Sequence, residues 1–140
     1  MGYNRYVNSH AALLQIIMGK ELDNEYYDEA YKGAKKYEVH YTKSIYYEIW
    51  KGIVKELSKD VPHILDLGCG PGQFAQMLID NGLSYSYGVD FSKTAIEMAR
   101  KVVKGNFYIE DLYEKGTYSI HDYNTVTCLE VLEHVADDLS

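Results

Sequence analysis

The sequence has few cysteines and prolines and no long hydrophobic run, and each absence excludes a class of protein. Its 140 residues include only two Cys and two Pro, too few for a disulfide-rich mini-protein or a collagen-like fibre. The apolar run at residues 11–18 is much shorter than a membrane span of roughly 20 residues, and no small-residue cleavage site follows it. We therefore expect a globular, cytoplasmic protein without a membrane span.

Positive charge is also scarce, and the shortage is concentrated near the end of the sequence. Residues 1–104 carry 13 basic and 13 acidic side chains, whereas residues 105–140 carry one lysine and eight acids, so that the net charge is −7. Binding to a phosphate backbone requires clustered Lys and Arg side chains. The charge distribution therefore disfavours nucleic acid as a partner.

The hydrophobic pattern changes at Pro62. Before it, apolar residues recur at helical spacing, which predicts helices over residues 11–19, 26–34 and 45–57. After it, the pattern predicts strands at 63–67, 85–89, 106–109 and 125–129, and helices at 73–81 and 92–103. Strands that alternate with helices form parallel sheets. We therefore predict an α/β fold, with a helical cap over residues 1–60 and a ligand-binding core over residues 61–140.

The most informative segment joins the first predicted strand to the helix after it. Residues 64–74 read ILDLGCGPGQF, with glycines at positions 68, 70 and 72. Glycines at such a junction allow a sharp turn and let a ligand lie against backbone amides at a helix N-terminus. The dinucleotide fingerprint would need glycine in place of Gln73, and the Gly-Lys-Ser/Thr sequence of the P-loop is absent. The loop thus predicts a ligand site of another kind.

Two acids near this loop indicate the chemistry of the ligand. Asp66 would repel a phosphate and favour an ammonium group. Asp90 ends the second predicted strand 20 residues after Gly70, a spacing at which an acid reaches ribose hydroxyls in doubly wound folds. An adenosine with a cationic tail fits both acids. The alternatives are a buried acid bonded to loop amides for Asp66 and a strand-end cap for Asp90.

Four segments, taken in order, resemble the motifs of the class I S-adenosylmethionine-dependent methyltransferases. Residues 66–72 (DLGCGPG) are similar to the first motif, Asp90 to the acid that ends the second strand, and Asp111-Leu112 to the pair after the third strand. Residues 126–135 (VTCLEVLEHV) more narrowly resemble the ubiquinone-biosynthesis O-methyltransferase type. The resemblance implies a Rossmann-like, doubly wound parallel sheet with N-terminal covering helices, and S-adenosylmethionine as the cofactor.

The resemblance also implies a role for each motif residue. The methionine part of the cofactor would lie against the backbone of Gly68, Cys69 and Gly70, in the motif that Gly72 completes. The rest of the cofactor would be held by Asp90 at the ribose, Phe91 stacked on the adenine, Asp111 and Leu112 at the adenine edge, and the carbonyl of Leu129 at the amino group. The alternatives are core packing for Phe91 and turn formation for Asp111.

Tyrosine is abundant, and nine of the 15 tyrosines precede residue 60. They could line a binding cleft, although packing between helices is the simpler interpretation. Tyr41, together with His40, could form a lid over the cofactor, and packing is again the alternative.

Glu130, Glu133 and His134 would share one helix face because they are three and four residues apart. Similar clusters serve a magnesium site in some ubiquinone-type O-methyltransferases and in small-RNA 2'-O-methyltransferases. We take His134 and Glu130 as catalytic candidates that promote ionisation of an acceptor hydroxyl. Because Mg²⁺ prefers oxygen ligands, a metal site is the weaker hypothesis. A solvated acidic helix start without a chemical role is the other alternative.

Together these features predict an S-adenosylmethionine-dependent methyltransferase that acts on oxygen or nitrogen of a small-molecule acceptor. A non-catalytic S-adenosylmethionine-binding module, or a fragment of a larger methyltransferase, is the first alternative, and a small-RNA 2'-O-methyltransferase is the second. The resemblance implies seven strands, whereas the sequence stops about a turn after the fourth predicted strand. We therefore expect a truncated fold whose fourth strand could form a homodimer edge.

Overall fold

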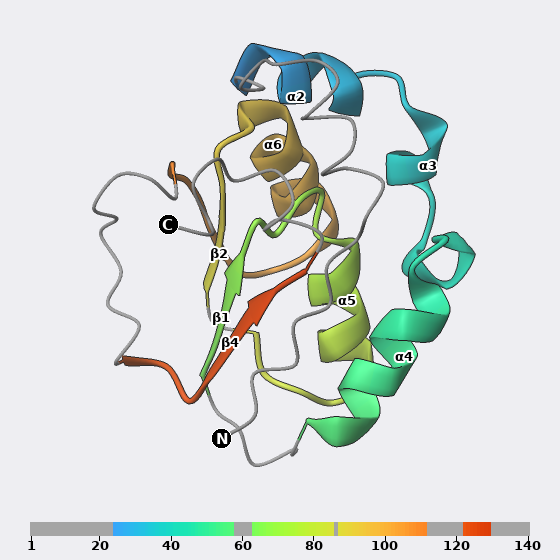
Figure 1. Cartoon of the computed structure of the whole chain (residues 1–140), viewed down its shortest axis with the longest axis vertical. Helices are drawn as coiled ribbons and strands as arrows, with labels where there is room; N and C mark the ends of the chain where they lie inside the picture. Colours follow the sequence, from blue (N-terminus) through green and yellow to red (C-terminus); the bar gives the residue numbers. More distant parts are fainter. Residues whose placement is uncertain (1–23, 58–62, 86, 112–121, 130–140) are drawn as a thin grey trace, which may run out of the picture.

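A parallel sheet forms the centre of the computed structural model, which describes residues 24–57, 63–85, 87–111 and 122–129 (Figure 1). Within these ranges the sheet has four strands, in the order β3-β2-β1-β4. The strands are β1 (Ile64–Leu67), β2 (Tyr87–Asp90), β3 (Asn106–Ile109) and β4 (Thr125–Cys128). All three pairings are parallel. The strand order changes direction between β1 and β4, which is the ligand-binding switch point of doubly wound sheets. The predicted Rossmann-like fold class is confirmed.

Two helices connect the first three strands. α5 (Gln73–Asp80) follows β1, and α6 (Lys93–Val102) follows β2. Both pack on the same face of the sheet, because residues of α5 and α6 share one buried cluster with Phe107 of β3. α6 begins after Ser92, whose hydroxyl accepts a hydrogen bond from the Ala95 amide at 3.2 Å, as the predicted N-cap requires.

Short helices precede the sheet in the chain. They are α2 (Asn24–Tyr31), α3 (Lys35–Glu38), the 3₁₀ turn η1 (Tyr41–Lys43) and α4 (Tyr47–Glu56). The helix predicted over residues 26–34 ends earlier, because Gly33 adopts a left-handed backbone with φ of 68°. The helix predicted over residues 11–19 lies outside the described residues. Among the described helices, none has the length and apolar character needed to cross a membrane.

α4 packs on α5, and α2 packs on α6 (Figure 1). The indole of Trp50 and the ring of Phe74 have centroids 5.7 Å apart, and both side chains are buried. The same cluster contains Ile64 of β1. α4 and η1 therefore share hydrophobic contacts with the sheet and its crossover helix.

Candidate functional site

The glycine loop lies between the carboxyl end of β1 and the start of α5. Gly68, Gly70 and Gly72 have φ values of 69°, 55° and 85°, which are strained for any residue with a side chain. Two hydrogen bonds join the loop to β2: the Cys69 amide donates to the Val89 carbonyl, and the Gly70 amide donates to Asp90 Oδ2, both at 2.9 Å. The loop and the acid that ends β2 therefore meet at one edge of the sheet.

Asp90 is 7% exposed, and both of its carboxylate oxygens accept backbone hydrogen bonds. Oδ2 accepts from the Gly70 amide, and Oδ1 accepts from the Ser92 amide, each at 2.9 Å. Burial raises the pKa of Asp90 above its ordinary value, although the amides of Ser92 and Gly70 act to lower it. The Phe91 amide is a third backbone partner of this carboxylate. Since a carboxylate offers about four lone-pair sites, some acceptor capacity remains for a ligand hydroxyl.

Two further predicted residues lie beside Asp90. Phe91 is half-buried, and its ring centroid is 4.9 Å from that of Tyr27 on α2. Asp111 is exposed just beyond the end of β3, where the Glu110 amide donates to the Asp90 carbonyl at 3.0 Å. The structure therefore brings Asp90, Phe91 and Asp111 to the same edge of the sheet. Leu112 lies outside the described residues.

The glycines of the loop meet different requirements. A Cβ added to Gly70 would meet the Tyr31 hydroxyl at 3.4 Å, so this glycine lies under a side chain of α2. A Cβ added to Gly72 would meet the Cα and Cβ atoms of Ala99 at 3.0 Å. Gly72 therefore allows the start of α5 to approach α6 closely.

Asp66 lies in the interior beneath the loop and is 2% exposed. Its Oδ1 accepts a hydrogen bond from Thr127 Oγ1 at 2.7 Å, and its Oδ2 accepts one from the Tyr85 hydroxyl at 3.1 Å. Burial raises the pKa of Asp66 to about 7, against the opposing effect of these two hydrogen bonds. The side chain is thus buried, and its described partners are two hydroxyl groups rather than loop amides.

Cys69 is also buried, although it stands in the middle of the loop. Its Sγ donates to the Gly70 carbonyl at 3.7 Å. Burial raises the thiol pKa well above its ordinary value, and the nearby Asp66 and Asp90 add to this effect. A thiol with a raised pKa is a poor nucleophile, so the loop can use Cys69 only through its backbone.

Comparison with known proteins identifies the family. A model of a methyltransferase domain matches residues 41–139. The chain belongs to this methyltransferase family. A ubiquinone biosynthesis O-methyltransferase of Neisseria meningitidis serogroup C is 32% identical over 83 residues, which cover 53% of this chain and 34% of that protein. The chain therefore spans about a third of the length of the curated relatives that it matches.

Solved structures support the same fold for this methyltransferase domain. An S-adenosylmethionine-dependent methyltransferase from Mesorhizobium loti has a TM-score of 0.56 at 23% identity, with 69% of this chain and 45% of that chain covered. A protein from Pyrococcus horikoshii has a TM-score of 0.55 at 26% identity, with 70% and 49% covered. Both likenesses extend beyond half of this chain.

Tyr41 is not brought to the glycine loop of the methyltransferase domain. Its ring is 8% exposed and packs in the cluster of Trp50 and Phe74. Burial raises its pKa, and a hydrogen bond to Asp80 at the far end of α5 adds to the rise. These contacts correspond to the packing alternative rather than to a lid.

The remaining predicted residues lie around β4. Leu129 directly follows β4 and packs partly buried against the cluster between β1, α4 and α5, so its backbone is near the switch point. Glu130, Glu133 and His134 lie outside the described residues. Among the residues that are described, no group of three or more His, Cys, Asp or Glu side chains could hold a metal ion.

The site also contains residues that the sequence did not single out. Tyr27, Asp28 and Tyr31 of α2 contact the region around the glycine loop and the start of α6. Tyr27 and Tyr31 are four residues apart and therefore share a helix face. This spacing was the available signal, but tyrosines on a short helix more often indicate simple packing.

Proposed function

We propose that this methyltransferase domain binds S-adenosylmethionine at the glycine loop and supports methyl transfer to a small-molecule acceptor. The observation that carries the proposal is the hydrogen bond between the Gly70 amide and the Asp90 carboxylate at 2.9 Å. It joins the glycine loop after β1 to the acid that ends β2, next to the switch point between β1 and β4 at which doubly wound folds bind their nucleotide ligands. The family and the O-methyltransferase relatives support the same chemistry.

The described residues fit the parts of this cofactor. Backbone groups of Gly68, Cys69 and Gly70 would hold the methionine part, and the remaining acceptor capacity of Asp90 would bind the ribose. The cofactor, when bound, supplies an electrophilic methyl group on a sulfonium. Phe91 and Asp111 would contact the adenine, together with Leu112, and the carbonyl of Leu129 would orient the amino group. Alignment of donor and acceptor would then provide most of the rate enhancement.

Asp66 would act from below this site rather than on its surface. Its hydrogen bonds to Tyr85 and Thr127 join the end of β1 to the residues that precede β2 and to β4. The negative charge that the acid carries when ionised would favour the cationic sulfonium and ammonium groups above it. We therefore keep Asp66 in the proposed cofactor-binding set as a buried supporting group.

The acceptor side of the site is proposed from sequence alone. His134 and Glu130 would promote ionisation of the acceptor group, and a magnesium ion held with Glu133 is the weaker hypothesis. We also propose a cytoplasmic location, no nucleic-acid partner, a helical cap over residues 1–60 with a cofactor-binding core over residues 61–140, and a homodimer through the edge of β4. A homodimer predicts a doubled mass in light scattering, and a monomer at all concentrations would exclude it.

A second candidate function is a cofactor-binding module without turnover. The observation in its favour is that the chain covers about a third of its curated relatives. The two candidates agree on the cofactor site and differ only in whether a methyl group is transferred.

Isothermal titration calorimetry with S-adenosylmethionine and S-adenosylhomocysteine tests both candidates. We expect wild type to bind both ligands and Asp90→Ala to bind them about 10- to 100-fold more weakly, since the variant removes a charge-assisted acceptor worth about 1.5–3 kcal/mol. Asp80→Asn is the control, because this acid lies at the opposite end of α5. Circular dichroism would verify that the variants are folded.

The outcomes separate the candidates. Binding followed by methylation of catechol-type acceptors supports the methyltransferase, and binding without turnover of any acceptor tested supports the module. Absence of binding by the folded wild type excludes both functions.

A further inference from the structure

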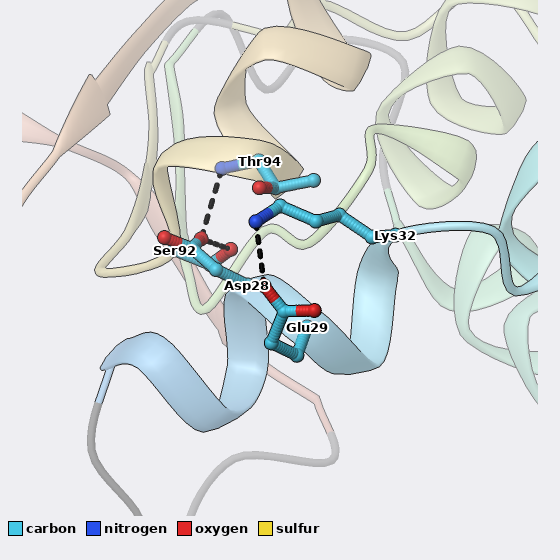
Figure 2. Close-up of polar contacts among 5 residues, drawn as sticks. All are labelled: Asp28, Glu29, Lys32, Ser92 and Thr94. Atoms are coloured by element: carbon cyan, nitrogen blue, oxygen red, sulfur yellow. Dashed lines mark hydrogen bonds and ion pairs between the residues drawn. The ribbon is translucent and has the colours of Figure 1, made fainter.

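α2 lies against the start of α6, beside the predicted cofactor site (Figure 1). One side chain of α2 reaches into that junction. Figure 2 shows Asp28 pointing at Ser92 and Thr94, the residues that begin α6. Asp28 Oδ1 accepts a hydrogen bond from the Ser92 hydroxyl at 2.5 Å and another from the Thr94 amide at 3.0 Å. The carboxylate is therefore a second cap for α6, contributed from a helix more than 60 residues earlier in the sequence.

The chemistry of this contact favours an ionised acid. A negative charge at a helix N-terminus is stabilised by the amide dipoles of the first turn. Although burial acts to raise it, hydrogen bonds from Ser92 and Thr94 lower the pKa of Asp28 below its ordinary value. The Ser92 hydroxyl donates to Asp28 while it accepts from the Ala95 amide. Both hydrogen-bonding functions of Ser92 are thus used in one junction.

The same helix places two aromatic rings over the proposed cofactor site. The Tyr27 ring packs against Phe91 with centroids 4.9 Å apart. The Tyr31 hydroxyl lies next to Gly70, at 3.4 Å from the position of an added Cβ. Burial raises the pKa of Tyr31 far above its ordinary value, and the nearby Asp90 adds to the rise. Tyr31 is therefore a neutral phenol that can donate a hydrogen bond at the glycine loop.

Glu29, the next residue of α2, has a different environment. It pairs with Lys32 at 2.6 Å, and the two side chains are 72% and 58% exposed (Figure 2). An exposed pair of this kind contributes little to stability. Two adjacent acids on one short helix therefore differ in direction, since Asp28 faces α6 whereas Glu29 faces solvent. This contrast provides a matched control.

We propose that Asp28 is a positioning residue that holds α2 over the glycine loop, and that Tyr27 and Tyr31 form the ligand-facing roof of the cofactor site. The inference rests on the proposed function, because it assigns these residues to the site for S-adenosyl ligands. Asp28 acts through the start of α6 and does not itself touch the ligand. Tyr27 packs on Phe91 at the adenine end, and Tyr31 covers the loop at the methionine end.

Calorimetric titration with S-adenosylhomocysteine tests the role of Asp28. We expect Asp28→Ala to bind about tenfold more weakly, a change within the usual range for coupling between distant groups. Asp28→Asn should recover much of the affinity, since its amide oxygen can accept the same two bonds, and Glu29→Gln should bind like wild type. Hydrogen exchange should accelerate in α2 and at residues 92–95 in Asp28→Ala, but not in Glu29→Gln.

Tyr31→Phe tests the roof formed by Tyr27 and Tyr31 separately from the positioning role of Asp28. The ring and its packing remain while the hydroxyl is lost, so affinity should fall severalfold with no faster exchange in α2. If Asp28→Ala does not fold, Tyr31→Phe still tests the roof.

The possible results are distinct. Wild-type affinity in folded Asp28→Ala overturns the positioning role, and wild-type affinity in Tyr31→Phe overturns the roof. Tighter binding in Asp28→Ala also overturns the proposal, because α2 would then obstruct the site. If the wild type itself does not bind S-adenosylhomocysteine, the proposed function fails and this inference fails with it. A loss of affinity in Asp28→Ala and Tyr31→Phe, but not in Glu29→Gln, supports both the positioning role of Asp28 and the roof.

Discussion

The buried carboxyl group of Asp66 makes the stability of this chain depend on pH in an unusual direction. Its pKa is about 7 in the folded chain, whereas the ordinary value is 3.8. Between these two values the folded chain retains a proton that the unfolded chain has released. The stabilising contribution of this group is therefore complete at low pH and is lost as the pH rises through 7.

The size of the effect follows from the two pKa values. A difference of about three pH units, at about 1.4 kcal/mol per unit, corresponds to about 4 kcal/mol in total, of which about 3 kcal/mol is lost between pH 5 and pH 8. Asp66→Asn removes the titration and keeps the shape of the side chain. Its amide oxygen can accept from Tyr85, and its NH₂ group can donate to Thr127, whose hydroxyl can then donate to the Leu65 carbonyl, 3.5 Å away. We expect the variant to be more stable than wild type at pH 8.

Urea unfolding at pH 5 and pH 8 measures this difference. The stability of Asp66→Asn relative to wild type should increase by about 3 kcal/mol from pH 5 to pH 8. Glu97→Gln is the control. This acid is 54% exposed, and its ion pair with Lys93, one helix turn earlier, is long at 3.8 Å, so its loss should change stability little at either pH. A stability difference between Asp66→Asn and wild type that is equal at both pH values would refute the reasoning.

Two further substitutions test the packing that shapes the site. Gly72→Ala should lower the free energy of unfolding by about 2–4 kcal/mol, because a φ of 85° and a contact with Ala99 at 3.0 Å both oppose a side chain. Gly82→Ala has a similar φ of 76° but nothing within 4 Å, so it should cost only about 1–2 kcal/mol in the same urea titration. Trp50→Ala should cost about 3–5 kcal/mol by opening the core between α4 and α5, whereas Ile49→Ala, at a side chain 57% exposed, should change stability by less than about 1 kcal/mol. Equal losses of stability in Gly72→Ala and Gly82→Ala would show that the contact with Ala99 has no energetic role. Equal losses in Trp50→Ala and Ile49→Ala would show the same for the packing of Trp50.

The strands and the glycine loop could be predicted because their signals are local. Short apolar runs between turn residues marked β1, β3 and β4 to within a residue at each end, and β2 was displaced by two residues at its start. The spacing between Gly70 and Asp90 predicted an acid at the carboxyl ends of the strands, where it can reach the ribose of a ligand. The hydrogen bond between the Gly70 amide and Asp90 was not predicted and comes from the structure.

The surroundings of individual side chains could not be predicted in the same way. Tyr41 is an aromatic residue next to a histidine, which is compatible with a lid or with a core, and only the contacts with Trp50 and Asp80 distinguish them. Asp66 stands within a ligand-binding motif, yet it lies on the inward face of β1 and bonds to Tyr85 and Thr127. The direction of a side chain depends on how strands pair, and that information is spread over the whole chain.

The sequence by itself determined the α/β class, the glycine loop and the acid opposite it, because strand propensity, helix caps and glycine conformation act over a few residues. Only the tertiary structure decided that Gly72 lets α5 approach α6 closely, that Asp66 is buried and that Asp28 caps a helix formed more than 60 residues later. These features arise when the chain excludes water and distant groups must satisfy one another's hydrogen bonds. The proposed roof of the cofactor site belongs to this second kind of information.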